Sequence, residues 1–307
     1  MSRARRSILL PTLLLVALLG AGCGEEGDCE SGADGCTAPP DRFQEARAFA
    51  DVETMVGFGP RPSGSPANAR QARYLAGELE RAGVEDVTIG APYANVTGVI
   101  PGREDGYVVI GAHHDTKGGV PGFVGANDGA SGTAVVLELA RTLPNPIPGP
   151  GIAIALFDAE EARGNRPFEE DGTRGSRDYV ATAEAGGEPR AGIPALDEIR
   201  AMVLFDMVGD CDLQIPRELA SDPELYGVFA DAAGGAPFEG TAGTILDDHV
   251  PFLEAGIPAV NFIDFTFGGS QPPGSYWHTP EDALDKVCPA SLDALGETAL
   301  AALGEIR

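Results

Sequence analysis

Short apolar runs alternate along this chain with longer amphipathic stretches. The apolar runs predict buried strands at 85–89, 96–101, 107–112, 151–157, 201–206 and 257–263. Apolar residues recur at helical spacing at 41–57, 66–83, 128–143, 175–185, 222–233, 248–255 and 290–305. Strands that alternate with helices in this way are typical of the α/β class. We therefore expect a single α/β domain with a twisted, mostly parallel central β-sheet and helices on both faces.

The N-terminal segment has a different composition. Three arginines precede the apolar residues 8–19, and small residues then lead to Cys23, a pattern typical of a secretory signal and too short for a good membrane span. The residues before Cys23 resemble a bacterial lipobox, which predicts a lipoprotein-type signal peptide at 1–22 and a lipid on Cys23. Ordinary cleavage and release is the alternative. Residues 23–40 are acidic and glycine-rich, as in a flexible tether, so the folded domain is expected at 41–307.

Charge and cysteine content narrow the possible partners. The chain has 21 Lys and Arg against 47 Asp and Glu, a net charge of −26, which argues against nucleic acid because phosphate binding depends on basic residues. We expect an exported monomer, facing the periplasm or the cell surface, that meets the membrane only through its lipid anchor. Export permits disulfides. Four cysteines remain after Cys23 and allow three pairings. Local closure favours Cys29 with Cys36, which leaves Cys211 with Cys288.

Most residues that could carry chemistry follow directly after a predicted strand. They are His113, His114, Asp115, Asp158, Glu160, Glu161 and Asp206, with Asp128, Asp247, Asp248, His249, Trp277 and His278 in nearby loops or at a helix start. In a parallel sheet the ligand site lies beyond the carboxyl ends of the strands, so these side chains should gather at one edge. A single strand-end Asp is more often a turn former or a helix cap, and we expect His114 to point outward. The joint pattern nevertheless predicts a site.

The three carboxylates within residues 158–161 identify the chemistry further. Adjacent carboxylates resist desolvation, so they are tolerated on a solvated loop, beside a cation, or where a proton is shared. Imidazole and carboxylate groups together suit zinc, and no cysteine is placed to help. One of the paired glutamates, Glu160 and Glu161, can then bind metal while its neighbour stays free as a base.

The motifs "AHHDT", "GANDGASG", "FDAEE", "LFDMVG", "DDHVPFLEAGIP" and "WHTPED" together resemble those of the zinc aminopeptidase and glutaminyl cyclase superfamily. The segment "GFGPRPSGSPANARQARYL" is similar to the one that opens the catalytic domain in this group, and the resemblance runs over residues 53–305. It implies a zinc aminopeptidase-like fold. It also makes 41–307 a zinc-dependent catalytic domain.

The resemblance implies two sets of metal ligands that share one aspartate. One set is Asp128, Glu161 and His278, and the other is Asp128, His113 and Asp206. Asp115 would orient His113 as a carboxylate behind the ligand. In the peptidases both sets hold zinc, whereas in the animal cyclases only the set with Glu161 does. The resemblance therefore implies one Zn²⁺ for a cyclase and two for an aminopeptidase.

The same resemblance assigns the remaining roles. Glu160 would be the acid/base, and Asp247 and Asp206 would share protons with it. Trp277, the only Trp in the chain, would pack on the substrate's glutamine; a plain core aromatic is the alternative. The substrates would be peptide or protein N-termini.

Smaller features favour the cyclase branch over the peptidases. The chain has "DDH" where peptidases usually have Ser-Asp-His, and "WHT" where they have Tyr-His-Thr, while "GTRGSRDYV" also resembles the cyclases. Animal cyclases carry a second active-site Trp shortly after the paired glutamates, and "EEARGNRPFEED" has none, so the substrate pocket must differ. We therefore expect a zinc-dependent glutaminyl-peptide cyclotransferase, with a zinc aminopeptidase as the alternative. A non-catalytic relative is disfavoured because every ligand position is intact.

Overall fold

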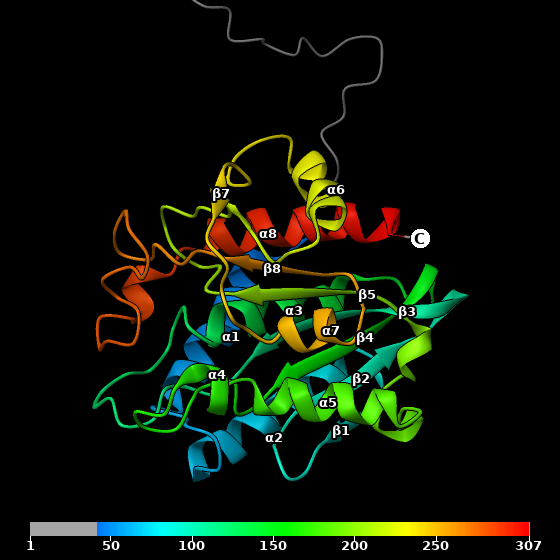
Figure 1. Cartoon of the computed structure of the whole chain (residues 1–307), viewed down its shortest axis with the longest axis horizontal. Coiled ribbons are helices and arrows are strands. Elements are labelled where there is room, and N and C mark those ends of the chain that lie inside the picture. The colour runs from blue at the N-terminus through cyan, green and yellow to red at the C-terminus, as the bar shows by residue number, and fades with distance from the viewer. Residues whose placement is uncertain (1–41, 307) are drawn as a thin grey trace, which may run out of the picture. The chain divides into compact units, whose positions relative to one another are not determined.

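Six strands form the central sheet of the computed structural model, which describes residues 42–306 (Figure 1). The strands are β1 (Glu85–Ile89), β2 (Val96–Ile100), β3 (Gly102–His113), β4 (Ile147–Phe157), β5 (Ile199–Asp206) and β8 (Ala259–Ile263). Their order in the sheet is β1-β2-β4-β3-β5-β8. β4, β3, β5 and β8 run parallel, and β1 and β2 complete the sheet with antiparallel pairings. The prediction of a mostly parallel sheet is confirmed.

Eight α-helices surround this sheet among the described residues. They are α1 (Glu45–Gly57), α2 (Pro66–Arg81), α3 (Ala130–Thr142), α4 (Phe168–Asp171), α5 (Arg174–Glu184), α6 (Pro223–Ala233), α7 (Val250–Glu254) and α8 (Pro289–Ala302). The sequence predicts all but α4, which is a single turn. It also misses β6 (Arg217–Glu218) and β7 (Thr241–Ala242), a parallel pair outside the main sheet. At the start of α2, Ser65 Oγ accepts a hydrogen bond from Asn68 N, which is the cap that its position predicts.

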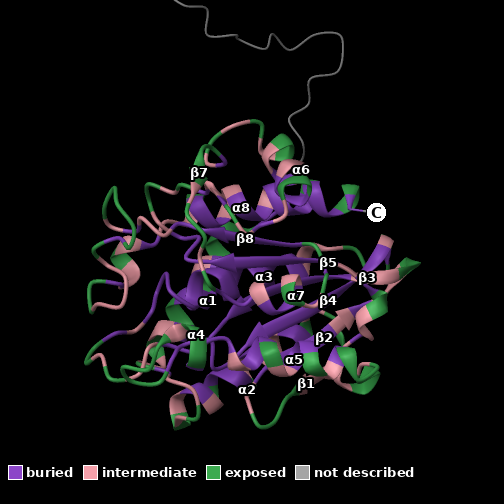
Figure 2. Ribbon diagram, viewed as in Figure 1, coloured by how far each residue is buried: buried purple, intermediate pink, exposed green. Residues whose placement is uncertain are grey.

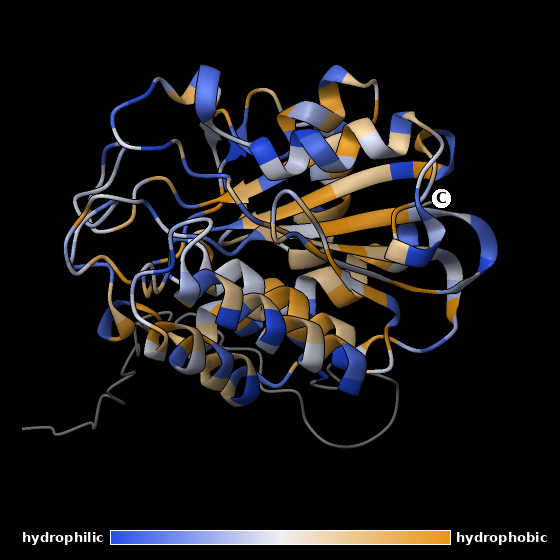
Figure 3. Cartoon of the chain, turned by 90° about the horizontal axis from the view of Figure 1, so that it is seen from below, coloured by the Kyte–Doolittle hydropathy of each residue, from blue (hydrophilic) through white to orange (hydrophobic). Residues whose placement is uncertain are grey.

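The sheet separates two apolar cores. Val108 and Ile110 of β3 pack with α1, α2, α3, α6 and α8, whereas Val109 packs with α5 and α7. Neighbouring strand residues point to opposite faces, so a continuous apolar run is what a sheet covered on both sides requires. The parallel strands β3, β4, β5 and β8 are accordingly buried over the halves that lead to their carboxyl ends (Figure 2) and are strongly apolar there (Figure 3), whereas β1 at the edge of the sheet has no buried residue. The described residues thus form one α/β domain.

Strand register brings the ends of the parallel strands level with one another. His113 at the end of β3 pairs with Phe157 at the end of β4, and Gly111 pairs with Leu204, two residues before the end of β5. The arrowheads of β5 and β8 point to the same side in Figure 1. Helix α3 packs closely behind this edge, since a Cβ on Gly132 would lie 2.0 Å from the carbonyl oxygen of Phe205. The start of α3 and the end of β5 are therefore in close backbone contact.

A disulfide joins Cys211 and Cys288, with 4.9 Å between their Cα atoms, which confirms that pairing. The predicted signal peptide at 1–22, the tether at 23–40, the lipidated Cys23 and the bond between Cys29 and Cys36 lie outside the described residues. Within residues 42–306, none of the helices has the length and apolar character needed to cross a bilayer.

Candidate active site

One candidate metal-binding group forms where β3, β5 and the loop before α3 meet. His113 Nε2 lies 3.1 Å from Asp128 Oδ1 and 3.2 Å from Asp206 Oδ1. Strand register accounts for two of these positions, since His113 ends β3 and Asp206 ends β5. The third comes from a loop, because α3 begins only at Ala130. These are the residues of one predicted ligand set.

A second group shares Asp128. His278 Nε2 lies 2.8 Å from Glu161 Oε1 and 3.5 Å from Asp128 Oδ2. In each group the ligand atoms lie within 4.8 Å of one another, so each could hold one ion. Asp128 presents one carboxylate oxygen to each histidine. The two predicted sets are therefore brought together side by side.

The donor atoms of these groups fit a cation. Asp128 Oδ2 and both carboxylate oxygens of Glu161 are buried, and apart from their ion pairs with His278 and Lys117 they have no hydrogen-bond partner among the described residues. A buried carboxylate is costly unless it is paired or coordinates a metal. Imidazole nitrogens and carboxylate oxygens are the ligands that zinc accepts in open sites. The ammonium group of Lys117, with Nζ 3.3 Å from Glu161 Oε2, partly offsets the negative charge of these carboxylates.

Buried carboxylates hold the loops that carry the candidate ligands. Asp115 accepts hydrogen bonds from the backbone N–H groups of Glu160 at 3.1 Å and Glu161 at 3.4 Å, and its Oδ1 lies 3.7 Å from His113 Nδ1. Asp282 accepts from the N–H of Asp128 at 3.0 Å, and burial raises the pKa of Asp282 to about 7. Asp115 thus holds the backbone that carries Glu161, and Asp282 holds the backbone that carries Asp128.

The backbone of the site is strained at three points. Ala159, Met207 and His278 have φ values of 60°, 45° and 54°, in the left-handed region that non-glycine residues rarely adopt. Each either is a candidate ligand or lies next to a residue of the site. Such strain costs about 1–3 kcal/mol per residue and persists only where surrounding contacts hold it. It turns the chain sharply at the ends of β4 and β5.

A fully buried arginine links two of these loops. Arg61 donates from Nη1 to the carbonyl oxygen of Val124 at 2.5 Å and from Nη2 to that of Gly125 at 3.1 Å. Its backbone N–H donates to Thr116 Oγ1 at 2.8 Å. Burial lowers the pKa of Arg61 to about 10, which still leaves it charged at neutral pH. Arg61 thereby fixes the segment just before Asp128 against the segment just after Asp115.

Glu160 and Asp247 are buried carboxyl groups that line the same pocket. Burial raises the pKa of Glu160 well above its ordinary value, and the charges of Glu161 and Asp247 raise it further. Burial likewise raises the pKa of Asp247, with added repulsion from Asp206 and Asp248. Asn261 Nδ2 donates to Asp247 Oδ2 at 2.7 Å and fixes its orientation. Burial and the neighbouring carboxylates therefore favour the protonated form of both groups.

A pocket of about 490 Å³ opens onto both groups. Trp277 stacks on the ring of His278, with 3.8 Å between ring centroids and 19° between planes, and meets Phe265 edge-on. Phe168 of α4 also lines the pocket, in the stretch where the sequence lacks a second Trp. The pocket lining therefore includes the aromatic side chains of Phe168, Phe265 and Trp277.

Besides Asp115, four residues of the predicted cluster do not line the pocket, namely His114, Asp158, Asp248 and His249. Asp248 is buried and accepts a hydrogen bond from Ser176 Oγ. His114 is fully buried rather than outward-pointing, with Nε2 3.0 Å from the carbonyl oxygen of Ala94, so that prediction is wrong. A strand covered on both faces buries alternate residues on both sides. Asp158 accepts hydrogen bonds from Ser63 and Asn68 and connects the start of α2 to the end of β4.

His249 faces a buried carboxylate instead of the pocket. Its Nε2 lies 3.4 Å from Glu218 Oε2, and Glu218 also accepts backbone hydrogen bonds from Ala220, Ser221 and Ile245. Burial opposes ionisation of Glu218, but these partners lower its pKa to about 2. The pair anchors the loop that leads to Asp247.

The chain belongs to peptidase family M28, whose model matches residues 95–303. It is 29% identical to the glutaminyl-peptide cyclotransferase of Drosophila melanogaster over 242 residues, which are 66% of this chain and 62% of that protein. It is 30% identical to aminopeptidase YwaD of Bacillus subtilis (strain 168) over 205 residues, 64% of this chain and 40% of that protein. The chain therefore spans less than two thirds of either relative.

Among solved structures, a glutaminyl cyclase from an Acidobacteriales bacterium is similar to the chain with a TM-score of 0.76. The two are 30% identical, and the match covers 90% of this chain and 99% of that one. A leucine aminopeptidase precursor from Bacteroides thetaiotaomicron gives a TM-score of 0.71 at 27% identity, over 87% and 98%. The protein is thus an enzyme of the M28 family, and both cyclases and aminopeptidases share its fold.

Proposed function

We propose that the protein is a zinc-dependent glutaminyl-peptide cyclotransferase, which converts an N-terminal glutamine to pyroglutamate and releases ammonia. The observation that carries this proposal is the group of Glu160, Asp206 and Asp247 in one pocket, with burial raising the pKa of Glu160 and Asp247. A cyclisation needs a residue that accepts a proton and returns it within one turnover. A partly protonated carboxylate group suits that task.

Asp128, Glu161 and His278 would hold the Zn²⁺, which supplies Lewis-acid polarisation of an amide carbonyl when bound. Glu160 takes a proton from the substrate's α-amine as that nitrogen bonds to the side-chain amide carbon. The bond from this carbon to the amide nitrogen then breaks, and Glu160 returns the proton to the departing nitrogen. One ammonia leaves, and no water is consumed.

The aromatic wall supports the same assignment. Trp277 lines the same pocket as Glu160, and its ring is fixed by stacking on His278 and by an edge-on contact with Phe265, so an amide side chain that enters the pocket meets aromatic surface. Ring stacking of this kind adds binding surface without a charge that would have to be desolvated.

Aminopeptidase activity is the second candidate, and one observation favours it. The group of His113, Asp128 and Asp206 is as complete as the group that holds Glu161, so two Zn²⁺ could be bound instead of one. Glu160 would then deprotonate a water molecule that attacks the first peptide bond. The product would be a free amino acid and a peptide shortened by one residue.

Mass measurement separates the two reactions. The purified protein, supplied with zinc, is incubated with a Gln-initiated peptide, an otherwise identical Leu-initiated peptide and the N-acetylated form of each. Loss of one ammonia from the Gln peptide alone supports the cyclase. Loss of the first residue from either peptide overturns it in favour of the aminopeptidase, and the acetylated peptides should remain unchanged in both cases.

We also propose that the protein is exported and anchored by a lipid on Cys23, on the strength of its N-terminal sequence. Cys23→Ser should release the protein from the membrane fraction or block its maturation. A wild-type protein that is soluble, unlipidated and cleaved at another residue would contradict the proposal.

A further inference from the structure

A second hollow of about 630 Å³ adjoins the catalytic pocket. The two share four lining residues, which are Thr244, Ile245, Ile263 and Phe265. Ile245 lies two residues before Asp247, and Phe265 contacts Trp277 edge-on. A chain whose first residue lies beside Glu160 can therefore continue over this shared wall into the second hollow.

The second hollow is lined by apolar and uncharged polar residues, and its two charged residues are acidic. Pro216, Pro272 and Pro273 face it along with the shared apolar wall, and none of the described residues that line it is Lys, Arg or His. Asp264 is occupied, because its side chain accepts hydrogen bonds from the backbone of Gln214 and from Thr266. Glu239 is exposed. It is thus the negative charge most accessible to a ligand.

Strand β7 gives the hollow a means to hold a main chain. Thr241 and Ala242, which form β7, line the hollow, and within residues 42–306 this strand pairs only with β6. A strand that is paired on one side has a free edge of N–H and C=O groups, to which an extended peptide can add. Glycines at 240 and 243 flank it and leave the approach unobstructed by side chains.

We propose that this hollow binds the residues that follow the N-terminal residue of a peptide substrate, and that Glu239 makes it prefer basic over acidic ones. The inference rests on the proposed function only in requiring a peptide N-terminus as substrate, so it holds for either reaction. An exposed charge pair is worth about 0.2–1 kcal/mol. The preference should therefore amount to about one and a half- to fivefold in kcat/KM.

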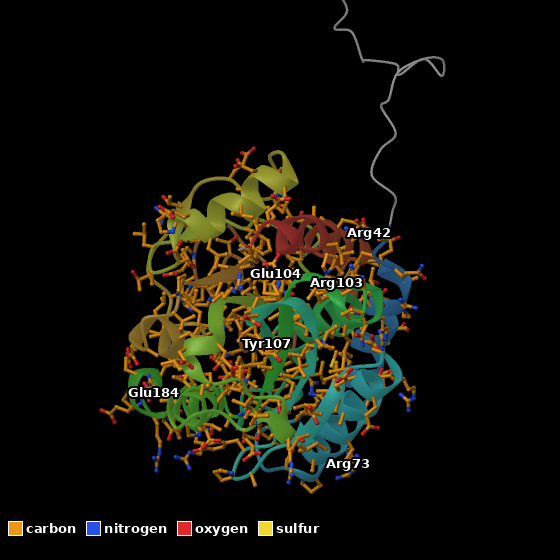
Figure 4. All side chains as sticks on the ribbon, turned by 90° about the vertical axis from the view of Figure 1, so that its right-hand side faces the viewer. Arg42, Arg73, Arg103, Glu104, Tyr107 and Glu184 are labelled. Carbon is orange, nitrogen blue, oxygen red and sulfur yellow. A yellow bond between two sulfur atoms is a disulfide. The ribbon has the colours of Figure 1, made fainter. Side chains whose placement is uncertain are left out.

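Three peptides that differ only at positions two and three test the proposal: Gln-Lys-Lys-Ala, Gln-Ala-Ala-Ala and Gln-Glu-Glu-Ala. The wild type should turn over the Lys peptide fastest and the Glu peptide slowest. Glu239→Lys should reverse that order. Glu184→Lys is the matched control, since it makes the same change in net charge at the exposed end of α5 (Figure 4). It should keep the wild-type order.

Further measurements keep the two proposals separable. Glutamine amide has no following residue, so Glu239→Lys should convert it at the wild-type rate. The subsite proposal is overturned if both variants shift the peptide series equally, because the preference would then reflect the net charge of −26. If the protein removes the first residue instead of cyclising it, the rate of amino-acid release from the same three peptides is compared.

If the protein turns over none of these peptides, fluorescence anisotropy of labelled Lys and Glu peptides measures binding to the hollow alone. Equal affinities for the two peptides would refute the proposed preference.

Discussion

The neighbouring glutamates at the end of β4 allow a sharp test of the site, because the same substitution should have different effects one residue apart. Glu161 Oε1 lies 2.8 Å from His278 Nε2, and both of its carboxylate oxygens are buried. Glu161→Gln removes the charge from this ligand set. Even residues behind metal ligands typically cost about 10–100-fold in affinity when replaced, so zinc affinity should fall by about 100-fold or more.

Glu160→Gln should leave the metal in place. The ligand set of Asp128, Glu161 and His278 does not include Glu160, and the backbone of Glu160 remains held by Asp115. The amide cannot exchange a proton, so turnover should fall by about two to four orders of magnitude, the usual contribution of general acid/base catalysis. This corresponds to about 3–5 kcal/mol of transition-state stabilisation.

The assay measures zinc affinity and turnover on the same samples. Each variant is stripped of metal and titrated with zinc against a chromophoric chelator, and turnover is then measured at saturating zinc. Thermal unfolding checks that both variants are folded. The assignment is refuted if Glu160→Gln loses the metal while Glu161→Gln retains it. Full activity in both variants would mean that these carboxylates are not the active site.

Substitutions at three further places in the fold test what holds the site together. Arg61→Met leaves the carbonyl groups of Val124 and Gly125 without their buried donors, at about 1–3 kcal/mol each, so urea unfolding should show a loss of about 2–6 kcal/mol, with partial rescue by Arg61→Lys. Replacing both Cys211 and Cys288 by Ser opens a covalent loop with a sequence separation of 77 and should cost about 2–4 kcal/mol, whereas an unchanged unfolding midpoint would argue against this. The Glu218 carboxylate has a pKa of about 2, below its unfolded value of about 4.3. Its contribution to stability is therefore present above about pH 4.3 and is lost as pH falls toward 2; Glu218→Gln should lose it already at neutral pH, so its unfolding free energy should vary less with pH in this range.

Sequence reasoning succeeds for the residues that strands position. His113, Glu161 and Asp206 end or follow parallel strands, and the carboxyl ends of such strands meet at one edge whatever the loops do. Sequence reasoning misplaces His114. Alternation along a strand predicts that its side chain points away from that of His113, but it does not tell whether that face of the sheet meets solvent or a second core. In this sheet both faces are covered.

Residues in loops and in the single-turn helix α4 are harder to place from the sequence. Lys117 contacts Glu161, and Phe168 lines the pocket, yet neither lies in a periodic segment that would predict its direction. Arg61 is a stronger case, since a lone arginine between two prolines is typical of a surface residue. Only the folded path of the 124–128 segment supplies the carbonyl groups that accept its hydrogen bonds. A polar side chain whose hydrogen-bond partners are backbone groups far away in the sequence leaves no pattern from which its burial could be predicted.

The disulfide has a consequence for proteolysis. The glycine-rich segment at 239–243 is largely exposed, and exposed loops with small residues are preferred sites of cleavage. A cut there would place Asp128, Glu160 and Glu161 on one fragment and Asp247 and His278 on the other. Because Cys211 lies before the cut and Cys288 after it, the two fragments would remain one covalent molecule. A nicked protein would migrate intact on a non-reducing gel, separate into two bands on reduction, and carry both parts of the candidate site until then.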